Sequence, residues 1–217
     1  MDISPIILEG RHVRLEPLTE SHAEALISAA RDGELWKSTL TVVPSRDTIA
    51  DYLQAALDGQ AQGRELPFVI IRKPPLECAD LSAISKAATG RPMNFEVVGT
   101  TRFYEIRPND RAVAIGYTWL AKSAQRTPIN TEAKLLLLTH AFEQWDCVRV
   151  ELITDLLNEQ SRAAILRLGA KQEGILRRHL ILPSGRNRDS VVFSIIAEEW
   201  PGVKRRLSAR LNEKAPR

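Results

Sequence analysis

Apolar and polar residues follow each other along this chain with two periods, and each period predicts one kind of element. Alternating positions or short apolar runs, typical of strands, occupy 11–18, 66–73, 94–106, 111–120, 148–156, 174–182 and 189–200. Apolar residues at helical spacing occupy 21–30, 44–59, 158–169 and about 198–211, and a long helix begins at Pro128. Strands and helices mixed in this order predict a single α/β domain, residues 1–217, around a central sheet.

Local signals predict several element ends. Ser21 and Glu24 have the spacing of a capping box at the start of the first helix, and Pro44 opens the second. Asn158 is a favourable N-cap, and Gly169 is a typical C-terminal stop for the helix between them.

Two further segments predict connections. Pro-Ser-Gly at 183–185 predicts the turn of a hairpin between the last two strands. Residues 74–93 form a Pro- and Ala-rich insertion that is long for a hairpin loop, and both a functional flap and local disorder fit it.

Composition places the chain among ordinary globular proteins, because 44% of its residues are apolar and 26% are charged. Thirty basic residues against 27 acidic ones give a formal net charge of +3, and the isoelectric point is near 9.0. Much of the excess lies in the C-terminal tail from Lys204 to Arg217. We interpret it as a solvated helix face, so nucleic-acid binding is not expected from charge alone.

The remaining composition predicts neither a metal centre nor a membrane anchor. Cys78 and Cys147 lie far apart, and the four histidines are dispersed. His140 lies within a leucine-rich helix, where a packed or solvent-facing histidine is expected rather than a ligand. The N-terminus lacks the charged start and long apolar run of a signal peptide, and no stretch approaches the roughly 18 apolar residues of a membrane span. A cytoplasmic protein is therefore expected, as a monomer or a homodimer.

The strand ending at Leu120 leads through a polar loop, 121–127, into the helix that begins at Pro128. Proline suits the first helical position, because its missing N–H would have no partner within the helix. The N–H groups expected to be free at this helix start are those of Arg126, Thr127, Ile129, Asn130 and Thr131. Together with the helix dipole and the side-chain charges of Lys122 and Arg126, they predict a phosphate or diphosphate site, although a helix capped by Thr127 and wetted by solvent is an equal alternative.

The stretch "GYTWLAKSAQRTPINTEAK" resembles the coenzyme A pyrophosphate loop of the GNAT superfamily of N-acetyltransferases, whose pattern is Q/R-x-x-G-x-G/A at the start of a long helix. Gln125 stands where the family has Gln or Arg. Pro128 and Asn130 occupy the two small positions, so Asn130 places a side chain where a diphosphate normally approaches bare backbone.

Further segments extend this resemblance to the RimJ/RimL-type branch. "GTTRFYEI" and "IGYTWL" are similar to its third and fourth strands, "NEQSRAAILRLGAKQEGILRRH" to its N-x-x-S helix and E-G turn, and "RDSVVFSI" to its closing strand. The match covers roughly residues 8–200 in order, with 74–93 as an insertion. It implies the GNAT fold, a mostly antiparallel twisted sheet of about six to seven strands whose fourth and fifth strands splay apart.

The resemblance also implies a binding mode for acetyl-CoA, which would lie between the splayed strands. A backbone N–H of Trp119 or Leu120 would stabilise the developing charge on the thioester carbonyl. Asn158 would contact the pantetheine or the diphosphate region, and Ser161, three residues later on the same helix face, would offer its hydroxyl to the sulfur. From the residues alone, Asn158 is a helix cap and Ser161 an ordinary first-turn serine.

The general base is the least determined part of the predicted site. Ala114 and Leu180 stand where relatives carry glutamates. His179 could titrate near neutrality, although strand alternation would place it on the opposite face from Leu180, and Tyr117, Glu105 or a chain of waters are further candidates.

The resulting hypothesis is an acetyl-CoA-dependent N-acetyltransferase that transfers acetyl directly to a primary amine. The branch implies a protein N-terminal α-amine as acceptor. A polyamine, an amino acid or an antibiotic is the alternative acceptor, and the missing glutamates leave a non-catalytic acyl-CoA-binding module as a rival of another class.

Overall fold

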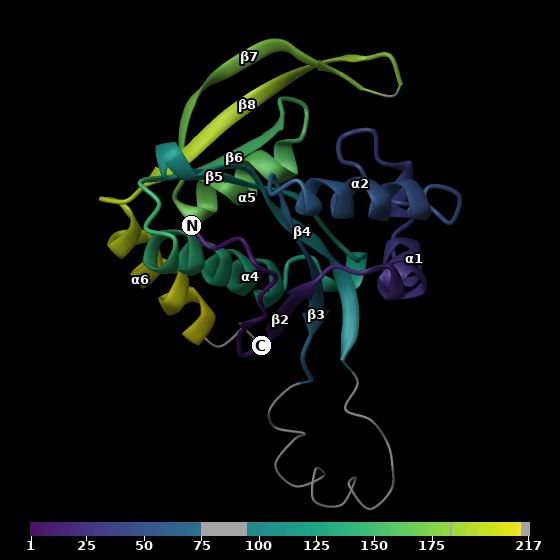
Figure 1. The fold of residues 1–217 in the computed structure, drawn as a ribbon, viewed down its shortest axis with the longest axis horizontal. Coiled ribbons are helices and arrows are strands. Elements are labelled where there is room, and N and C mark those ends of the chain that lie inside the picture. Colours follow the sequence, from purple (N-terminus) through teal and green to yellow (C-terminus); the bar gives the residue numbers. More distant parts are fainter. Residues whose placement is uncertain (75–94, 183, 214–217) are drawn as a thin grey trace, which may run out of the picture.

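A single twisted sheet runs through the molecule, with helices on both of its faces (Figure 1). The computed structural model describes residues 1–74, 95–182 and 184–213. Its strands are β1 (Leu8–Glu9), β2 (Val13–Pro17), β3 (Leu66–Arg72), β4 (Glu96–Arg107), β5 (Ala112–Leu120), β6 (Arg149–Asp155), β7 (Lys171–Ile181) and β8 (Asn187–Ile196). Its α-helices are α1 (Ala23–Arg31), α2 (Ile49–Ala61), α4 (Pro128–Thr139), α5 (Glu159–Leu168) and α6 (Trp200–Asn212).

The spatial order of the strands is β1-β2-β3-β4-β5-β6-β8-β7. All neighbours are antiparallel except β5 and β6, which are parallel and pair only from Ala112 with Arg149 to Ala114 with Glu151. Beyond these pairs the two strands separate. The fold is therefore the mixed, mostly antiparallel sheet that the sequence predicted, and the parallel pair is the predicted fourth and fifth strands.

Helices cover the sheet unequally. α1 and α2 pack together over β3 and β4 on one face, called here the α2 side, whereas α4 and α6 pack side by side on the other face, called the α4 side (Figure 1). Residues 66–71 of β3 are all buried because the strand is covered on both faces. The hairpin of β7 and β8 extends beyond the helices, and most of β7 is exposed.

Several boundaries differ from the sequence-based expectations. Thr19 and His22, rather than Ser21 and Glu24, form the capping box, because a short 3₁₀ turn precedes α1. α2 begins at Ile49 rather than at Pro44, since the Ser45 N–H donates to the Thr48 side chain in a preceding turn. The sheet has eight strands because the two-residue β1 adds an edge.

Some predictions fall on residues that the structure does not describe. The insertion 74–93, apart from residue 74, lies outside the described residues, and so do Cys78 and Pro183 of the predicted hairpin turn. Cys147 is buried. No helix within the described ranges is long and apolar enough to cross a membrane.

Glu132 of α4 joins the N-terminal segment to the α4 side of the sheet. Its buried carboxylate accepts the backbone N–H of Arg11 at 2.8 Å, of His12 at 2.6 Å and of Val13 at 2.8 Å. Gly10 lies so close that a Cβ there would approach the carboxylate to 2.6 Å. This contact fixes where α4 lies on the sheet, and α4 carries the predicted anion site.

We expect Glu132→Gln to lower the free energy of unfolding by about 2–3 kcal/mol, because an amide N–H₂ would face backbone donors that now share a carboxylate. Urea denaturation at neutral pH measures the change. Glu24→Gln is the control: its ion pair with Arg46 is exposed on both sides, so about 0.5 kcal/mol or less is expected. Equal losses in the two variants would contradict the role given to Glu132.

Candidate functional site

A cleft of about 1660 Å³ opens where β5 and β6 separate. Its walls include 115–120 of β5 and 152–154 of β6, with Gln125, Asn130 and Lys134 from the α4 region. It continues to the α2 side, where the segment 38–43 between α1 and α2 and the β7–β8 hairpin contribute. The strand separation thus creates one passage that two ligands could enter from opposite sides.

A β-bulge in β5 shapes the middle of this cleft. Thr100 pairs with Trp119 and Arg102 with Gly116, so Tyr117 and Thr118 together oppose the single residue between them on β4. Tyr117 has a left-handed φ of 49°, which a tyrosine adopts only when its surroundings hold it there. The bulge turns the Tyr117 ring to the α2 side and the Thr118 hydroxyl to the α4 side.

The bulge also determines which backbone groups face the cleft. The Ala121 N–H donates to the Val98 carbonyl of β4 at 2.7 Å, and the Trp119 carbonyl points at Gly99 of the same strand. Strand alternation then turns the Leu120 N–H to the opposite edge, toward β6. Of the two backbone donors predicted to face a thioester, Leu120 is the one directed at the cleft.

On the α2 side a buried arginine supports the bulge. Arg102 is 3% exposed, and its guanidinium lies 4.4 Å from the centroid of the Tyr117 ring and 5.0 Å from that of Tyr52. It also donates to Glu65 at 2.8 Å. The Thr100 hydroxyl donates to the Tyr117 carbonyl at 3.2 Å, so side chains from α2, β4 and the start of β3 hold the left-handed residue.

On the α4 side a lysine supports the same bulge. Lys134 of α4 donates to the Thr118 hydroxyl at 2.6 Å and to the Thr101 hydroxyl at 3.2 Å. The two hydroxyls are 2.8 Å apart. Burial lowers the pKa of Lys134 to about 7, because removing an ammonium from water disfavours its charged form.

The start of α4 has the form expected of an anion site. Thr127 is the N-cap, with its hydroxyl accepting from the Ile129 N–H at 3.4 Å, and Pro128 is the first helical residue. Arg126 is left-handed, with φ 59°, and exposed. Helix geometry leaves the Asn130 N–H without a partner inside the helix, and Asn130 lies on the cleft wall. The Thr131 N–H, which was expected to be free, instead has the carbonyl of the N-cap Thr127 as its helical partner.

The Gln125 side chain holds the loop before α4 in place by hydrogen bonds and does not extend into solvent. Its side-chain N–H₂ donates to the Leu120 carbonyl at 3.0 Å, and its oxygen accepts from Gln160 of α5 at 3.4 Å. It therefore joins the end of β5 to α5 across the cleft.

α5 begins at the opposite wall. The Asn158 side chain accepts from the Ser161 N–H at 2.9 Å, which confirms Asn158 as the N-cap. Both residues line the cleft. Their assignment to coenzyme A remains a prediction, although the same arrangement leaves the Ser161 hydroxyl available to a ligand.

Three of the predicted acid–base candidates line the cleft: Tyr117, Glu105 and His179. Burial raises the pKa of the Tyr117 hydroxyl. Glu105 is exposed and left-handed, with φ 48°, in a second irregularity of β4. The His179 Nδ1 lies 3.0 Å from the Ser190 hydroxyl.

The expectation that His179 and Leu180 lie on opposite faces of β7 was wrong. β7 carries extra residues between its pairs Leu176 with Ser190 and Leu180 with Arg188, and Arg178 is left-handed. Because the bulge breaks the alternation, His179 and Leu180 both reach the cleft. His140 packs against Phe103 and Trp145, as expected.

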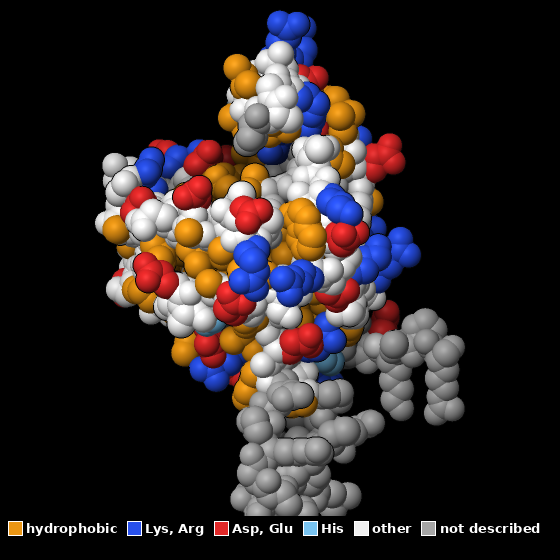
Figure 2. Space-filling model, turned by 90° about the vertical axis from the view of Figure 1, so that its right-hand side faces the viewer, with side chains coloured by type: hydrophobic (Ala, Val, Ile, Leu, Met, Phe, Trp, Pro, Cys, Tyr) orange, Lys and Arg blue, Asp and Glu red, His pale blue; other side chains and the backbone are white. Residues whose placement is uncertain are grey.

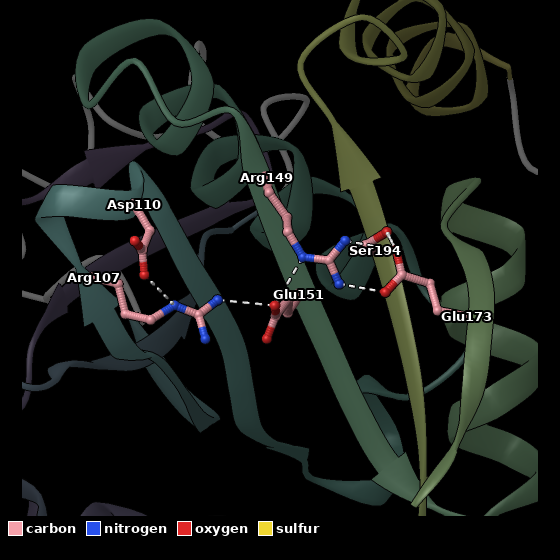
Figure 3. Close-up of polar contacts among 6 residues, drawn as sticks. All are labelled: Arg107, Asp110, Arg149, Glu151, Glu173 and Ser194. Carbon is pink, nitrogen blue, oxygen red and sulfur yellow. Dashed lines mark hydrogen bonds and ion pairs between the residues drawn. The ribbon is translucent and has the colours of Figure 1, made fainter.

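Sequence patterns did not indicate an ion-pair network at the base of the cleft. Arg107 of β4 donates to Glu151 at 2.8 Å, and Arg149 contacts both Glu151 and Glu173, which also accepts from Ser194 (Figure 3). The Arg149 and Ser194 contacts lower the pKa of Glu173 to about 2. The network joins β4, β6, β7 and β8 where β5 and β6 are still paired, and its members are too far apart in sequence to form a motif.

A nucleic-acid surface and a metal centre are two further classes of site, and neither was expected from the sequence. Basic and acidic side chains are interspersed over the face that carries α1 and α2 (Figure 2), whereas nucleic-acid binding calls for a continuous basic surface. Among the described residues no group of His, Cys, Asp and Glu could hold a metal ion.

Comparisons with known proteins agree with this geometry. A family model described as "Acetyltransferase (GNAT) domain" matches residues 12–171. The chain is 33% identical over 126 residues to the Bacillus subtilis (strain 168) protein named "Putative ribosomal N-acetyltransferase YdaF", an alignment that spans 58% of this chain and 66% of that protein, just under two thirds of its length.

Solved structures extend the similarity to nearly the whole chain. A GCN5-related N-acetyltransferase from Brucella melitensis is 30% identical, with a TM-score of 0.77 over 97% of this chain and 86% of that one. Mycobacterium smegmatis RimJ in complex with CoA-disulfide is 24% identical, with a TM-score of 0.69 over 95% of this chain and 93% of that one, and shares the fold.

We expect Gly99→Ala to lower the free energy of unfolding by about 2–3 kcal/mol, because its Cβ would lie 2.0 Å from the Trp119 carbonyl oxygen. Urea denaturation checks this. Gly174→Ala in β7 is the matched control, since nothing lies within 4 Å of the added methyl group; a change of about 0.5 kcal/mol or less is expected. A Gly99 variant as stable as this control would show that the bulge does not depend on the close approach.

Proposed function

Because the chain belongs to the GNAT acetyltransferase family, we propose that it transfers the acetyl group of acetyl-CoA directly to the α-amino group of a protein. The observation that carries the proposal is the cleft at the separated strands, which extends from the helix N-terminus on one side of the sheet to residues on the other side. The name of the Bacillus subtilis relative supports a ribosomal protein as acceptor.

The residues present suit coenzyme A. The Asn130 N–H group and the positive end of α4 would bind the diphosphate, with Arg126 adding a full charge beside them. The unpaired edges of β5 and β6 would accept the amide groups of the pantetheine arm as strand partners. When bound there, acetyl-CoA supplies an activated acyl group.

The chain's own groups would then assist transfer. The Leu120 N–H faces the cleft and would stabilise negative charge on the thioester carbonyl oxygen. Glu105, Tyr117 and His179 line the α2 side of the cleft, where an incoming amine would lose a proton to Glu105, to His179 or to water. The raised pKa of Tyr117 keeps its hydroxyl protonated near neutral pH, so it would contribute as a hydrogen-bond donor. Ser161, on the opposite wall, would donate a hydrogen bond to the sulfur.

The chemistry of the amine favours an α-amino acceptor over a lysine side chain. An α-amino group with pKa near 8 is roughly 10% neutral at pH 7, whereas a lysine near 10.4 is neutral in roughly 0.04% of molecules. Since the candidate bases are few, an acceptor that deprotonates readily suits this site better. A small amine is the alternative acceptor that the geometry of the cleft leaves open.

The acceptor can be tested directly by the release of coenzyme A thiol. We expect a peptide with a free N-terminus and no lysine to give a kcat/KM at least about tenfold above that of an N-blocked lysine peptide, a polyamine or a free amino acid. A preference for the polyamine or the amino acid would transfer the assignment to small amines. Binding of acetyl-CoA without release by any acceptor would indicate a non-catalytic acyl-CoA-binding module.

The cofactor cradle has its own test. Asn130→Asp places a carboxylate against the diphosphate, and we expect acetyl-CoA to bind about tenfold more weakly, a loss of about 1.4 kcal/mol. The unliganded protein should keep its stability, because an acid in the first turn of a helix interacts favourably with its dipole. Thermal shift and calorimetric titration with acetyl-CoA measure both quantities.

The matched control is Asn130→Ala, which removes the side chain without adding charge and should bind acetyl-CoA within about threefold of the wild type. Equal affinity of acetyl-CoA for Asn130→Asp and for the wild type would refute a diphosphate site at the start of α4.

A further inference from the structure

Lys134 is a buried amine that no carboxylate in the described part of the chain pairs with. The residue is 5% exposed, although lysine is almost never buried without an ionic partner. Its contacts are two neutral hydroxyls, those of Thr118 and Thr101. Burial is the one cause that lowers its pKa to about 7, with no contribution from any charged neighbour in the described ranges.

The Lys134 side chain lies at the wall of the cleft. Lys134 and Thr118 both line the cleft wall, whereas Thr101 lies behind them on β4. Lys134 is one turn further along α4 than Asn130, so it lies between the predicted diphosphate site and the β5 bulge. The elements packed around it, β4 and β5, present the two threonine hydroxyls to it.

When acetyl is transferred from a thioester, the departing sulfur needs a proton. The other groups on the α4 side are poor sources of that proton. An alkyl thiol such as that of cysteine has a pKa of about 8.5, so the departing thiolate takes up a proton near neutral pH. Serine and threonine hydroxyls can pass a proton on but are far too weak as acids to be its source. Tyr117 lies on the α2 side of the sheet, and its raised pKa makes it a weaker acid still.

We propose that Lys134 supplies, through the Thr118 hydroxyl, the proton that the coenzyme A sulfur takes up as it departs. This role rests on the proposed function. As the carbon–sulfur bond breaks, its electron pair remains on sulfur, which takes the Thr118 O–H proton while Lys134 passes one of its own to Thr118.

The protons taken up and released in the reaction are then equal in number, and no other reactant is needed. The surplus proton of the attacking amine leaves on the α2 side, to a cleft residue or to water. Lys134 is left as a neutral amine and regains a proton from solvent when the products depart. The Thr118 hydroxyl can reorient, because its resting bond to the Gly116 carbonyl is long, at 3.2 Å.

The state of Lys134 can be measured without any activity, by comparing the wild type with Lys134→Met across pH. The folded pKa near 7 lies below the unfolded value near 10.4, so the unfolded wild type binds an extra proton between these values. Wild-type stability relative to Lys134→Met should therefore be lowest below pH 7 and rise from pH 7 to about 10. A difference in melting temperature that stays constant with pH would overturn the inference.

The catalytic part is tested with two acyl donors. With acetyl-CoA we expect Lys134→Met and Thr118→Val each to lower kcat/KM at least about 30-fold. With the acetyl thioester of 4-nitrothiophenol, whose thiolate leaves without a proton, the loss should be less than about threefold. Thr118→Val keeps the test open if Lys134→Met folds poorly.

The outcomes separate the two proposals. A wild-type protein that transfers acetyl to no amine overturns the proposed function, and this inference with it. An active wild type whose variants lose equal factors with both donors, or lose nothing, overturns the inference alone. Loss confined to acetyl-CoA supports both.

Discussion

The parallel pairing of β5 and β6 ends at Ala114 and Glu151, and the rest of the site depends on that interruption. A sheet whose central strands stayed paired would have no passage between its faces. The ion pairs of Arg107, Glu151 and Arg149 hold the paired end together, so the strands diverge from a fixed base. The two strands are therefore paired at the base of the opening and separate toward the end where α4 and α5 begin.

The bulge at Tyr117 is the second constraint, because a left-handed tyrosine is costly and must be held. Arg102 holds it from the α2 side and Lys134, through Thr118, from the α4 side. Both are buried basic side chains, but Arg102 has the Glu65 carboxylate as partner and Lys134 has two hydroxyls. If the α4 side only had to support the bulge, a neutral side chain would cost less free energy to bury than a lysine. The lysine therefore calls for a chemical explanation.

The sequence predicted most of the fold because the strands and helices have clear periods and caps. Asn158 and Thr127 act as helix caps in the structure because their positions depend on a few neighbouring residues. Lys134 was missed because on the sequence it is one polar residue in a leucine-rich helix, and its contacts lie on two other strands. His179 was misplaced because a bulge depends on pairing across the hairpin, which periodicity along one strand does not report.

The backbone around the cleft departs from regular alternation at Tyr117, Glu105 and Arg178, all left-handed. Regular strands direct successive side chains to opposite faces, so they cannot bring neighbouring residues to the same cavity. The β7 bulge does this for His179 and Leu180, whereas Tyr117 and Thr118 in the β5 bulge still face opposite sides of the sheet and line opposite walls of one cleft. A two-sided site requires groups on one side that could accept a proton from an amine, and a group on the other side that could give a proton to a thiolate. The irregular positions supply such groups on both sides.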